Sequence, residues 1–597
     1  MNHLYVLNHF FWKYRWHFLG GIVFVSLSNY FRVLQPQAIR EALDLVINNL
    51  SLYRNFENSA LQHGLKILIG KQLLLFGLFV LLFAGLMGLF MYLMRQTIIV
   101  MSRLIEYDMR KEIFEHYQVL DLAFYKRNKT GDLMARITED VNKVRMYLGP
   151  AILYGINLVS LFVFVIYAMI NVSFELTLFC LIPLPILSIS IYYVSDLIHK
   201  KSEEIQQQLA ILNNTAQEVY AGIRVVKAYT QENSMLGFFT AQSQQYNQQS
   251  VSLAKINALF YPLMILLIGI STLITVYAGG TLVVKGSIST GNIAEFVIYV
   301  NMLTWPVTSI GWIASIIQQA SASQKRINEF MQTQPAVSSG NLKEFQLKGG
   351  IEFRNVSLTY PDTGICALKN LHVTIEPGQK IGIIGKTGSG KSSFAELILR
   401  MYDCTAGEIL FDGKNVKTLN LGRLREQIGY VPQDVFLFSE SLKENISFGN
   451  PDATDQEMEL AISNASLTNE IKTFPDGLNT MLGERGITLS GGQKQRVSIA
   501  RALLKNPEIL ILDDCLSAVD SHTENQILTD FQNTLKGKTA LIISHRIYTR
   551  LNFDKILVFQ DGEISHAGTH EELLKVSPYY LDLYERQLSD EKMEAEG

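Results

Sequence analysis

Long apolar runs separated by polar segments fill the first half of the chain and end near residue 320. Residues 72–94 contain no charged residue, and Glu175 is the single charge between residues 150 and 195. A helix needs about 20 apolar residues to cross a bilayer. The pattern predicts spans at about 16–38, 72–95, 148–170, 172–194, 256–284 and 291–320. We therefore expect six membrane helices, followed by a soluble half in which charged residues are frequent.

Composition supports this division. Of the 597 residues, 48% are hydrophobic and 18% are charged. A typical charged fraction is about 25%, so a wholly disordered or coiled-coil chain is excluded. The net charge of -3 provides no general attraction to nucleic acid. The cysteines are too few and too scattered for a disulfide framework or a zinc site: Cys180, Cys366, Cys404 and Cys515.

Basic residues gather in alternate loops. They precede span 1 and occupy the long polar segments after spans 2 and 4, as Lys13, Arg15, Arg103, Arg110, Lys126, Arg127, Lys129, Lys200, Lys201, Arg224 and Lys227. The opposite loops carry few, such as Arg54, Lys66 and Lys285. The positive-inside rule places both termini and both long segments, predicted to be helical hairpins, in the cytoplasm. Glu175 and Glu295 lie at predicted span ends, where a carboxylate can reach the interface.

A phosphate-binding loop is predicted at residues 385–392. The residues Gly385, Lys386, Thr387, Gly388, Ser389, Gly390, Lys391 and Ser392 fit the pattern G-x-x-x-x-G-K-[ST]. The apolar run 380–384 precedes them and residues 393–397 form a plausible helix, which is the context that this pattern requires. The glycines let backbone N–H groups surround phosphate oxygens, and the helix N-terminus adds positive potential. Lys391 is expected to reach the β- and γ-phosphates, and Ser392 to bind Mg²⁺.

A second element of the site ends the apolar strand 509–513. Its last residue, Asp513, would deliver a carboxylate to the Mg²⁺ at the carboxyl edge of the sheet. Between the two elements lies Leu489-Ser490-Gly491-Gly492-Gln493. Ser490 can cap the helix that follows, and the glycines expose its N-terminal amides.

Taken together, these motifs resemble ATP-binding cassette proteins. Ser490 to Gln493 resembles the family signature, and residues 517–520 resemble its D-loop. Gln433 resembles the Q-loop glutamine, His545 the switch histidine, and Tyr360 the aromatic residue that stacks on adenine. The resemblance implies an α-helical six-span transmembrane domain followed by an α/β P-loop ATPase domain.

The membrane half also resembles exporter-type half-transporters of this family. Residues 124–136 and 218–229 are similar to its two cytoplasmic coupling regions, and residues 35–44 to its first span. The implied organisation is a transmembrane domain (1–330), a linker (331–350), a nucleotide-binding domain (351–590) and an acidic tail (591–597). It also implies a multi-pass protein of the bacterial cytoplasmic (inner) membrane.

The resemblance implies a set of site residues. Asp514, His545 and Gln433 would act in hydrolysis, and Ser392, Gln433 and Asp513 would hold Mg²⁺. The residues expected to bind ATP are Tyr360, Gly385, Lys386, Thr387, Gly388, Ser389, Gly390, Lys391, Ser392, Ser393, Ser490, Gly491, Gly492 and Gln493. In the family each ATP lies between the phosphate loop of one half-transporter and the signature of a second, so a partner subunit is expected.

Asp514 departs from the family pattern, which usually has Glu after the strand Asp. One methylene fewer withdraws the carboxylate by about 1.5 Å, which should slow hydrolysis because a general base must lie within hydrogen-bond reach of its proton. We favour the hypothesis that this chain is the Asp-Asp member of a heterodimeric multidrug-type exporter and builds the degenerate site. A homodimeric exporter with a slow ATPase remains an alternative.

Two questions of function stay open at this point. An ATP-gated channel or regulator would also fit slow hydrolysis. The spans do not distinguish hydrophobic drugs, lipids and peptides as substrates.

Overall fold

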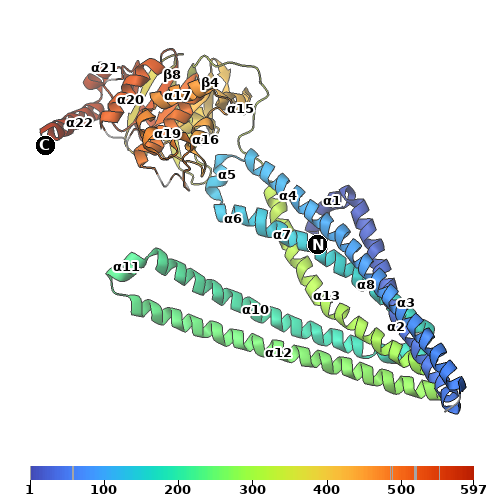
Figure 1. The fold of residues 1–597 in the computed structure, drawn as a ribbon. Helices are drawn as coiled ribbons and strands as arrows, with labels where there is room; N and C mark the ends of the chain where they lie inside the picture. The colour runs from blue at the N-terminus through green and yellow to red at the C-terminus, as the bar shows by residue number, and fades with distance from the viewer. Residues whose placement is uncertain are drawn as a thin grey trace. The chain divides into compact units, whose positions relative to one another are not determined.

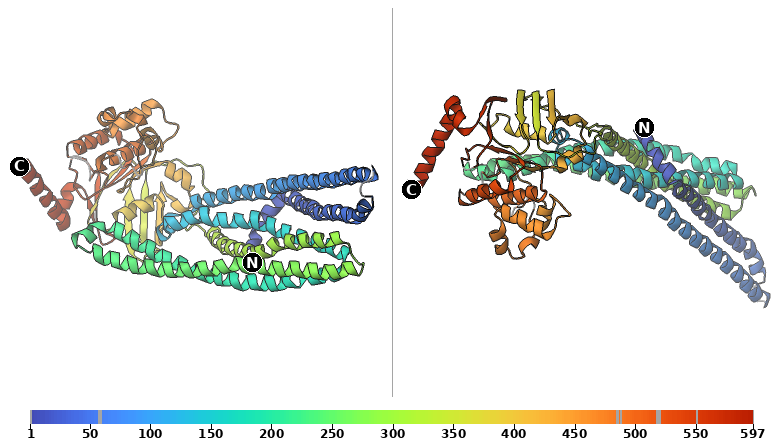
Figure 2. Two further views of the ribbon diagram at one scale, coloured as in Figure 1. Left: turned by 60° about the horizontal axis from the view of Figure 1, so that its bottom comes forward. Right: turned by 90° about the horizontal axis from the view of Figure 1, so that it is seen from above.

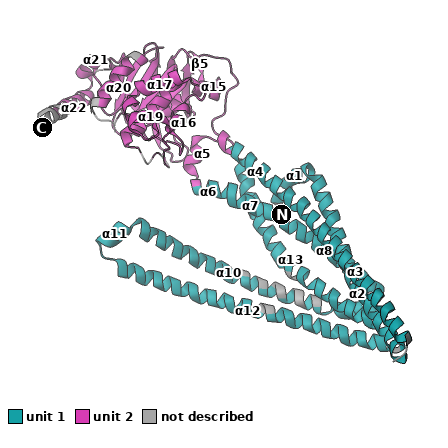
Figure 3. Cartoon of the chain, viewed as in Figure 1, with its two compact units in different colours: residues 1–116, 131–333 teal, residues 117–130, 334–597 magenta. Residues whose placement is uncertain are grey.

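The computed structural model describes residues 2–56, 60–483, 486, 489–516, 521–549 and 551–596. The chain divides into two units (Figure 3). The first comprises residues 1–116 and 131–333, and the second comprises residues 117–130 and 334–597. The predicted D-loop, 517–520, lies outside the described residues.

The second unit is built on two sheets (Figure 1). The larger sheet has the order β10 (Glu563–Gly568), β9 (Lys555–Gln560), β3 (Lys380–Gly385), β8 (Thr539–Ser544), β7 (Ile509–Asp513) and β6 (Ile428–Val431). Its strands are parallel except for the antiparallel pair β10–β9. The smaller, antiparallel sheet has the order β2 (Cys366–Ile375), β1 (Ile351–Thr359), β4 (Ala406–Phe411) and β5 (Lys414–Asn415).

Helix α14 (Lys391–Ile398) packs against both sheets. Its Phe394 stacks on Phe353 of β1 with ring centroids 4.5 Å apart and meets Phe559 of β9 edge-on at 5.5 Å. All three rings are fully buried. Burial of each ring contributes on the order of 2–3 kcal/mol, so the phosphate loop before α14 is anchored by the core of the unit.

The remaining helices of the second unit cover the sheets. They are α5 (Leu122–Arg127), α15 (Leu421–Glu426), α16 (Leu442–Ser447), α17 (Asp455–Asn464), α18 (Thr468–Thr473), α19 (Gly491–Leu504), α20 (Ser521–Thr534), α21 (His570–Val576) and α22 (Pro578–Glu596), with the short turns η5 (Val416–Thr418) and η6 (Gly477–Asn479). A second core cluster joins α16, α17, α19 and α20 to the strands β6, β7 and β8.

The first unit is helical. Its elements are η1 (Asn2–Leu7), α1 (Asn8–Lys13), α2 (Arg15–Asn55), α3 (Ala60–Met94), η2 (Arg95–Ile99), α4 (Val100–Val119), α6 (Thr130–Ala135), η3 (Arg136–Asp140), α7 (Val141–Met146), η4 (Tyr147–Ala151), α8 (Ile152–Val172), α9 (Phe174–Leu181), α10 (Pro183–Ala221), α11 (Ile223–Ala228), α12 (Glu232–Val284) and α13 (Thr290–Met331). Of these, α4 and α6 reach the unit boundary. Helices α10 and α12 run side by side in both views of Figure 2.

Five helical stretches of the described residues are long and apolar enough to cross a membrane. They are Arg15–Asn55, Leu61–Val119, Thr130–Val172, Glu232–Val284 and Thr290–Met331. The predicted fourth span, 172–194, is divided between α9 and α10, which begins at Pro183, and part of it has undescribed side chains. The helical membrane domain is therefore confirmed, and the count of six spans is not.

The first unit has its own apolar core. It contains Val33 of α2, Leu161 and Val165 of α8, and Phe296 and Tyr299 of α13, all with little or no exposure. Together with partners from α9 and α12, these side chains join helices that are distant in sequence.

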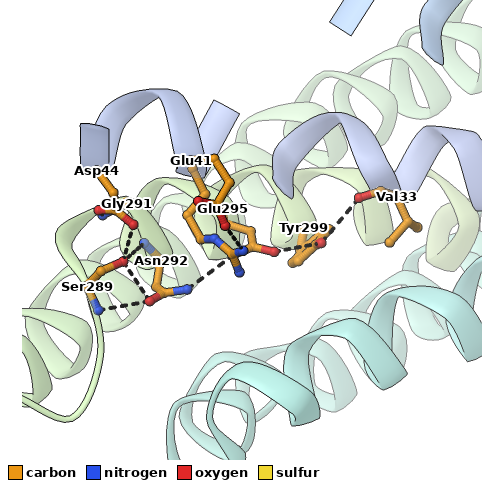
Figure 4. Close-up of polar contacts among 9 residues, drawn as sticks. Val33, Glu41, Asp44, Ser289, Gly291, Asn292, Glu295 and Tyr299 are labelled. Carbon is orange, nitrogen blue, oxygen red and sulfur yellow. Dashed lines mark hydrogen bonds and ion pairs between the residues drawn. The ribbon is translucent and has the colours of Figure 1, made fainter. Parts of the chain in front are cut away.

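Polar contacts join α2 to the beginning of α13 (Figure 4). Glu295 is fully buried rather than exposed at an interface. Its carboxylate accepts hydrogen bonds from Arg40 (3.2 Å), the Asn292 amide (3.3 Å) and the Tyr299 hydroxyl (2.9 Å). By contrast, Glu175 lies exposed in the first turn of α9.

Asp44 of α2 completes this network at the first turn of α13. Its carboxylate accepts hydrogen bonds from the Gly291 N–H (2.8 Å) and the Ser289 hydroxyl (2.6 Å). Ser289 and Asn292 form a reciprocal capping box at the same helix end. The acidic side chains of the network are thus satisfied within the unit, and they hold α2 and α13 together.

Arg40→Gln should destabilise the first unit. It leaves the Glu295 carboxylate buried without its cation, at a cost of about 3 kcal/mol, because removing one partner of a buried ion pair strands the other charge. The measurement is the midpoint of thermal unfolding of the full chain in detergent. The double variant Arg40→Met/Glu295→Leu should recover most of the lost stability.

Glu41→Gln is the matched control, because Glu41 also contacts Arg40 but its side chain is 53% exposed. We expect little change in its midpoint, since exposed ion pairs contribute about 0–1 kcal/mol. Equal losses in Arg40→Gln and Glu41→Gln would contradict this account of the network.

Candidate nucleotide-binding and hydrolysis site

The phosphate loop connects β3 to α14, as the sequence predicted. Gly388 and Gly390 have φ values of 80° and 100°, in the left-handed region that favours glycine. A Cβ on Gly390 would lie 2.7 Å from the Ala367 carbonyl oxygen, so the loop is closely packed as well as turned. The glycines therefore allow a backbone path that other residues would strain.

Lys391 is the first residue of α14 and is only 6% exposed. Its Nζ donates hydrogen bonds to the carbonyl oxygens of Gly385 (2.8 Å) and Lys386 (2.9 Å). Burial lowers the pKa of this amine, and the nearby Asp513 and Asp514 oppose that shift. The loop thus holds a desolvated ammonium close to its own backbone, where it can meet a phosphate.

Two carboxylates lie where β7 ends. Asp513 is 3% exposed, and burial raises its pKa while a hydrogen bond with Ser392 acts in the opposite direction. Asp514 adopts φ 47° and donates its backbone N–H to Ile543 of β8 at 2.9 Å. Burial also raises the pKa of Asp514, opposed chiefly by His545 and Lys391. Parallel pairing of β7 with β8 brings these groups to one edge of the sheet.

A cavity of about 480 Å³ lies at this edge. The predicted residues that line it are Tyr360, Thr387, Gly388, Gly390, Lys391, Ser392, Ser393, Gln433, Asp513, Asp514 and His545. Gly385, Lys386 and Ser389 belong to the loop but are not among the lining residues. Segments almost two hundred residues apart in sequence therefore form one site.

Tyr360 lines the cavity beside the loop. Its hydroxyl lies 2.8 Å from the Ser393 hydroxyl and donates to Glu396 at 2.8 Å. These bonds hold the ring against α14, as stacking on a planar ligand requires.

The structure does not bring Ser490, Gly491, Gly492 and Gln493 to this cavity. They begin α19, where Ser490 and Gln493 form a capping box: the Gln493 N–H donates to the Ser490 hydroxyl at 3.3 Å, and the Ser490 N–H to the Gln493 side chain at 2.9 Å. Within one chain these residues form a surface separate from the cavity, and from the sequence we expect them to meet the phosphate loop of a second subunit.

Several lining residues were not predicted: Ile365, Cys366, Ala367, Lys369, Ile543, Asp561 and Gly562. Most come from the beginning of β2 and from the β9–β10 turn. A hydrogen bond of 2.8 Å from the Lys369 N–H to the Gly562 carbonyl connects these two segments. No local motif marks them, because contacts between β2 of the smaller sheet and the β9–β10 turn of the larger sheet bring most of them together.

Helix α5 of the first predicted coupling region belongs to the second unit. Ala123 is buried in the core of that unit, and Lys126 forms an ion pair with Glu396 at 3.4 Å. The Lys126 ammonium also lies 5.1 Å from the ring centroids of both Tyr360 and Tyr402. One cation therefore connects the coupling region to the aromatic residue of the cavity.

Comparisons with known proteins agree with this geometry. Residues 18–307 match the family model of the ABC transporter transmembrane region, and residues 368–517 match that of the ABC transporter. The chain is 40% identical to the probable multidrug resistance ABC transporter ATP-binding/permease protein YheI of Bacillus subtilis, over 81% of this chain and 83% of the relative. It is 36% identical to the multidrug resistance-like ATP-binding protein MdlA of Escherichia coli, over 86% and 88%.

A solved structure of a bacterial Atm1-family ABC exporter with ATP bound has the same fold. It superposes with a TM-score of 0.76 at 24% identity, over 96% of this chain and 99% of that chain. The chain belongs to the ABC transporter family. It is a multi-pass half-transporter in which the second unit is the ATPase domain.

Gly390→Ala should weaken ATP binding by at least about 10-fold, because the added Cβ meets the Ala367 carbonyl and forces the loop to shift. Gly413→Ala is the matched control: Gly413 has a similar φ of 77°, but its Cβ would meet no atom within 4 Å. Binding of a fluorescent ATP analogue to the full chain measures both variants. Equal affinities would show that close packing of the loop is not needed.

Proposed function

We propose that this protein uses ATP to export a hydrophobic or amphipathic molecule, such as a drug, lipid or peptide, across a bacterial cytoplasmic membrane by alternating access. The observation that carries the proposal is the nucleotide cavity on the same chain as the apolar helices. The names of YheI and MdlA, both multidrug resistance relatives, support export. The proposed membrane domain has six spans, with both termini and both helical hairpins in the cytoplasm.

Different residues of the cavity would bind different parts of ATP. Tyr360 would stack on adenine, and the backbone of residues 385–393 would surround the phosphates. Lys391 would exchange its bonds to loop carbonyls for bonds to the β- and γ-phosphates.

Ser392, Gln433 and Asp513 are the proposed Mg²⁺ ligands. They line one cavity, and Ser392 bonds to Asp513. Hydroxyl, amide and carboxylate oxygens suit this ion, which supplies charge neutralisation at the phosphates when bound.

Hydrolysis would use residues at the far side of the cavity. His545 and Gln433 would orient the attacking water and the γ-phosphate, and Asp514 would accept the proton from that water. The carboxylate of Asp514 is one methylene shorter than that of glutamate, which moves the base away from its proton by about 1.5 Å.

ABC exporters work as dimers of half-transporters in the lipid bilayer. The Ser490–Gln493 surface would close the ATP site of the second subunit, because a helix N-terminus favours the γ-phosphate. Loss of that phosphate removes the contact and lets the two ATPase domains separate. We favour a heterodimer in which this chain contributes the slow site with Asp514 and completes the efficient site of its partner.

Asp514→Asn separates the heterodimer from the homodimer. In the heterodimer most ATP turnover should persist, because the efficient site belongs to the partner. In a homodimer the same change should abolish turnover. The measurement is the steady-state ATPase rate of the purified assembly, with Lys391→Ala as the control that prevents tight nucleotide binding at this site.

A second measurement uses the chain purified without a partner. Robust ATPase activity and transport by this chain alone would contradict the heterodimer proposal.

ATP-driven accumulation of a substrate in inverted membrane vesicles tests export itself. An exporter moves substrate against its gradient, whereas a channel cannot. One relative, the mitochondrial potassium channel ATP-binding subunit of Xenopus tropicalis, is 35% identical over 82% of this chain and 71% of its own length, and keeps the channel or regulator as the second candidate. ATP-dependent uptake that stops when the substrate concentrations inside and outside the vesicles are equal would favour the channel or regulator.

A further inference from the structure

Arg32 is a charged residue in the middle of the first membrane helix. At 1.5 Å per residue it lies about 25 Å along α2 from Arg15 and about 12 Å from Arg40. The Asn29 side chain donates to the Asn157 carbonyl of α8 at 3.2 Å. This register places Arg32 at the depth of Ser160, close to the middle of the apolar helix Ile152–Val172. The backbone of Arg32 therefore lies beside the middle of the apolar stretch of α8.

No ion pair or hydrogen bond joins the Arg32 side chain to any other residue of the described ranges. The network of Figure 4 contains the acidic residue Glu295. Its carboxylate already accepts hydrogen bonds from Arg40, Asn292 and Tyr299. Tyr299 also donates to the Val33 carbonyl, next in sequence to Arg32. The network thus satisfies its own charges and leaves the cation at residue 32 outside it.

Polar but uncharged side chains lie near Arg32 on α2. Ser28 and Gln35 lie on the same face of α2, and both contact Met87 of α3, through its carbonyl at 3.3 Å and its sulfur at 3.7 Å. Aromatic rings of α2 and α3 pack on the same stretch, since Phe31 lies 5.7 Å from Phe90.

A separate groove of about 460 Å³ lies between α2 and α8 and is lined mainly by apolar side chains, among them Val159 and Val163. On α2 it is lined by Ile22 and Ser26, about two to three turns before Arg32, which is not one of its lining residues. Its wall includes Ser160, whose hydroxyl has no hydrogen-bond partner within the described part of the chain. A molecule held here can therefore have both an apolar part and a polar group.

A partly buried guanidinium within a bilayer is costly unless an anion accompanies it, and such residues usually belong to substrate or ion pathways. We propose that Arg32 binds the anionic head group of an amphipathic substrate, a carboxylate or a phosphate or sulfate ester, while the apolar part lies against α2, α3 and α8. This inference rests on the proposed export function and narrows its substrate to amphipathic anions.

The test uses one pair of probes, a pyrene-labelled dodecanoic acid and its methyl ester, which differ in the negative charge of the head group and in one methyl group. The full-length assembly is placed in nanodiscs of zwitterionic lipid, and binding and stimulation of ATPase activity are measured for each probe. The wild type should prefer the acid. Arg32→Gln should raise the concentration of the acid needed for half-saturation roughly 10- to 100-fold, because a charged hydrogen-bonded contact is lost. The corresponding concentration of the ester should not change.

Two further variants make the result specific. Arg32→Lys should retain much of the preference, since it keeps the charge. Arg95→Gln is the matched control, because Arg95 is an exposed arginine at the end of the apolar part of α3. It should behave as the wild type. Nanodiscs that contain phosphatidylglycerol distinguish the source of the anion: Arg32-dependent stimulation by this lipid alone points to a lipid head group, and stimulation only by the added acid points to a soluble amphiphile.

Equal binding of acid and ester by the wild type, or no binding of the acid, overturns the inference. The inference is also overturned if the Arg32→Gln variant binds both probes equally weakly and dissociates into single subunits. That result would mean that Arg32 pairs with a carboxylate of the second half-transporter. Failure of the proposed function differs from these results: the wild type would then hydrolyse ATP without accumulating either probe in inverted vesicles.

Discussion

A charge withdrawn from water needs a partner of opposite charge or several hydrogen bonds, and this requirement governs both units. In the membrane unit it joins α2 to α13 through Glu295, Arg40 and Asp44. In the ATPase unit it gathers Lys391, Asp513 and Asp514 at one sheet edge, where their pKa shifts reflect both burial and mutual attraction. The same requirement makes Arg32 informative, because its side chain has no ion pair or hydrogen bond among the described residues.

The cavity of one chain contains only one of the two surfaces that are proposed to bind ATP. The cavity contains the phosphate loop, the strand-end carboxylates, Gln433 and His545, while the Ser490–Gln493 surface lies apart from it. This division gives the dimer a physical basis, because a ligand that contacts both surfaces favours their association. Lys126 adds a contact between α5 and Tyr360, the residue proposed to stack on adenine, within the same unit.

Local motifs predicted much of the site. Most of the pattern at residues 385–392 lines the cavity, as do Asp513 at the end of its strand and single residues such as Tyr360, Gln433 and His545. Asp561, Gly562 and Cys366 were missed because contacts between the two sheets, and no local pattern, bring them there. Glu295 was expected at an interface but is buried, since hydropathy alone does not show that Arg40 lies opposite.

The sequence by itself determined the two halves, the apolar helices, the nucleotide chemistry and the departure at Asp514, because length, periodicity and motif spacing are local properties of the chain. Only the tertiary structure decided which charges have partners. Arg32 and Arg40 are both arginines on one helix, yet Arg40 pairs with the buried carboxylate of Glu295, and Arg32 has no such partner in the described part of the chain. Packing between helices that are distant in sequence makes that difference, and it turns an ordinary apolar span into a candidate site for an anion.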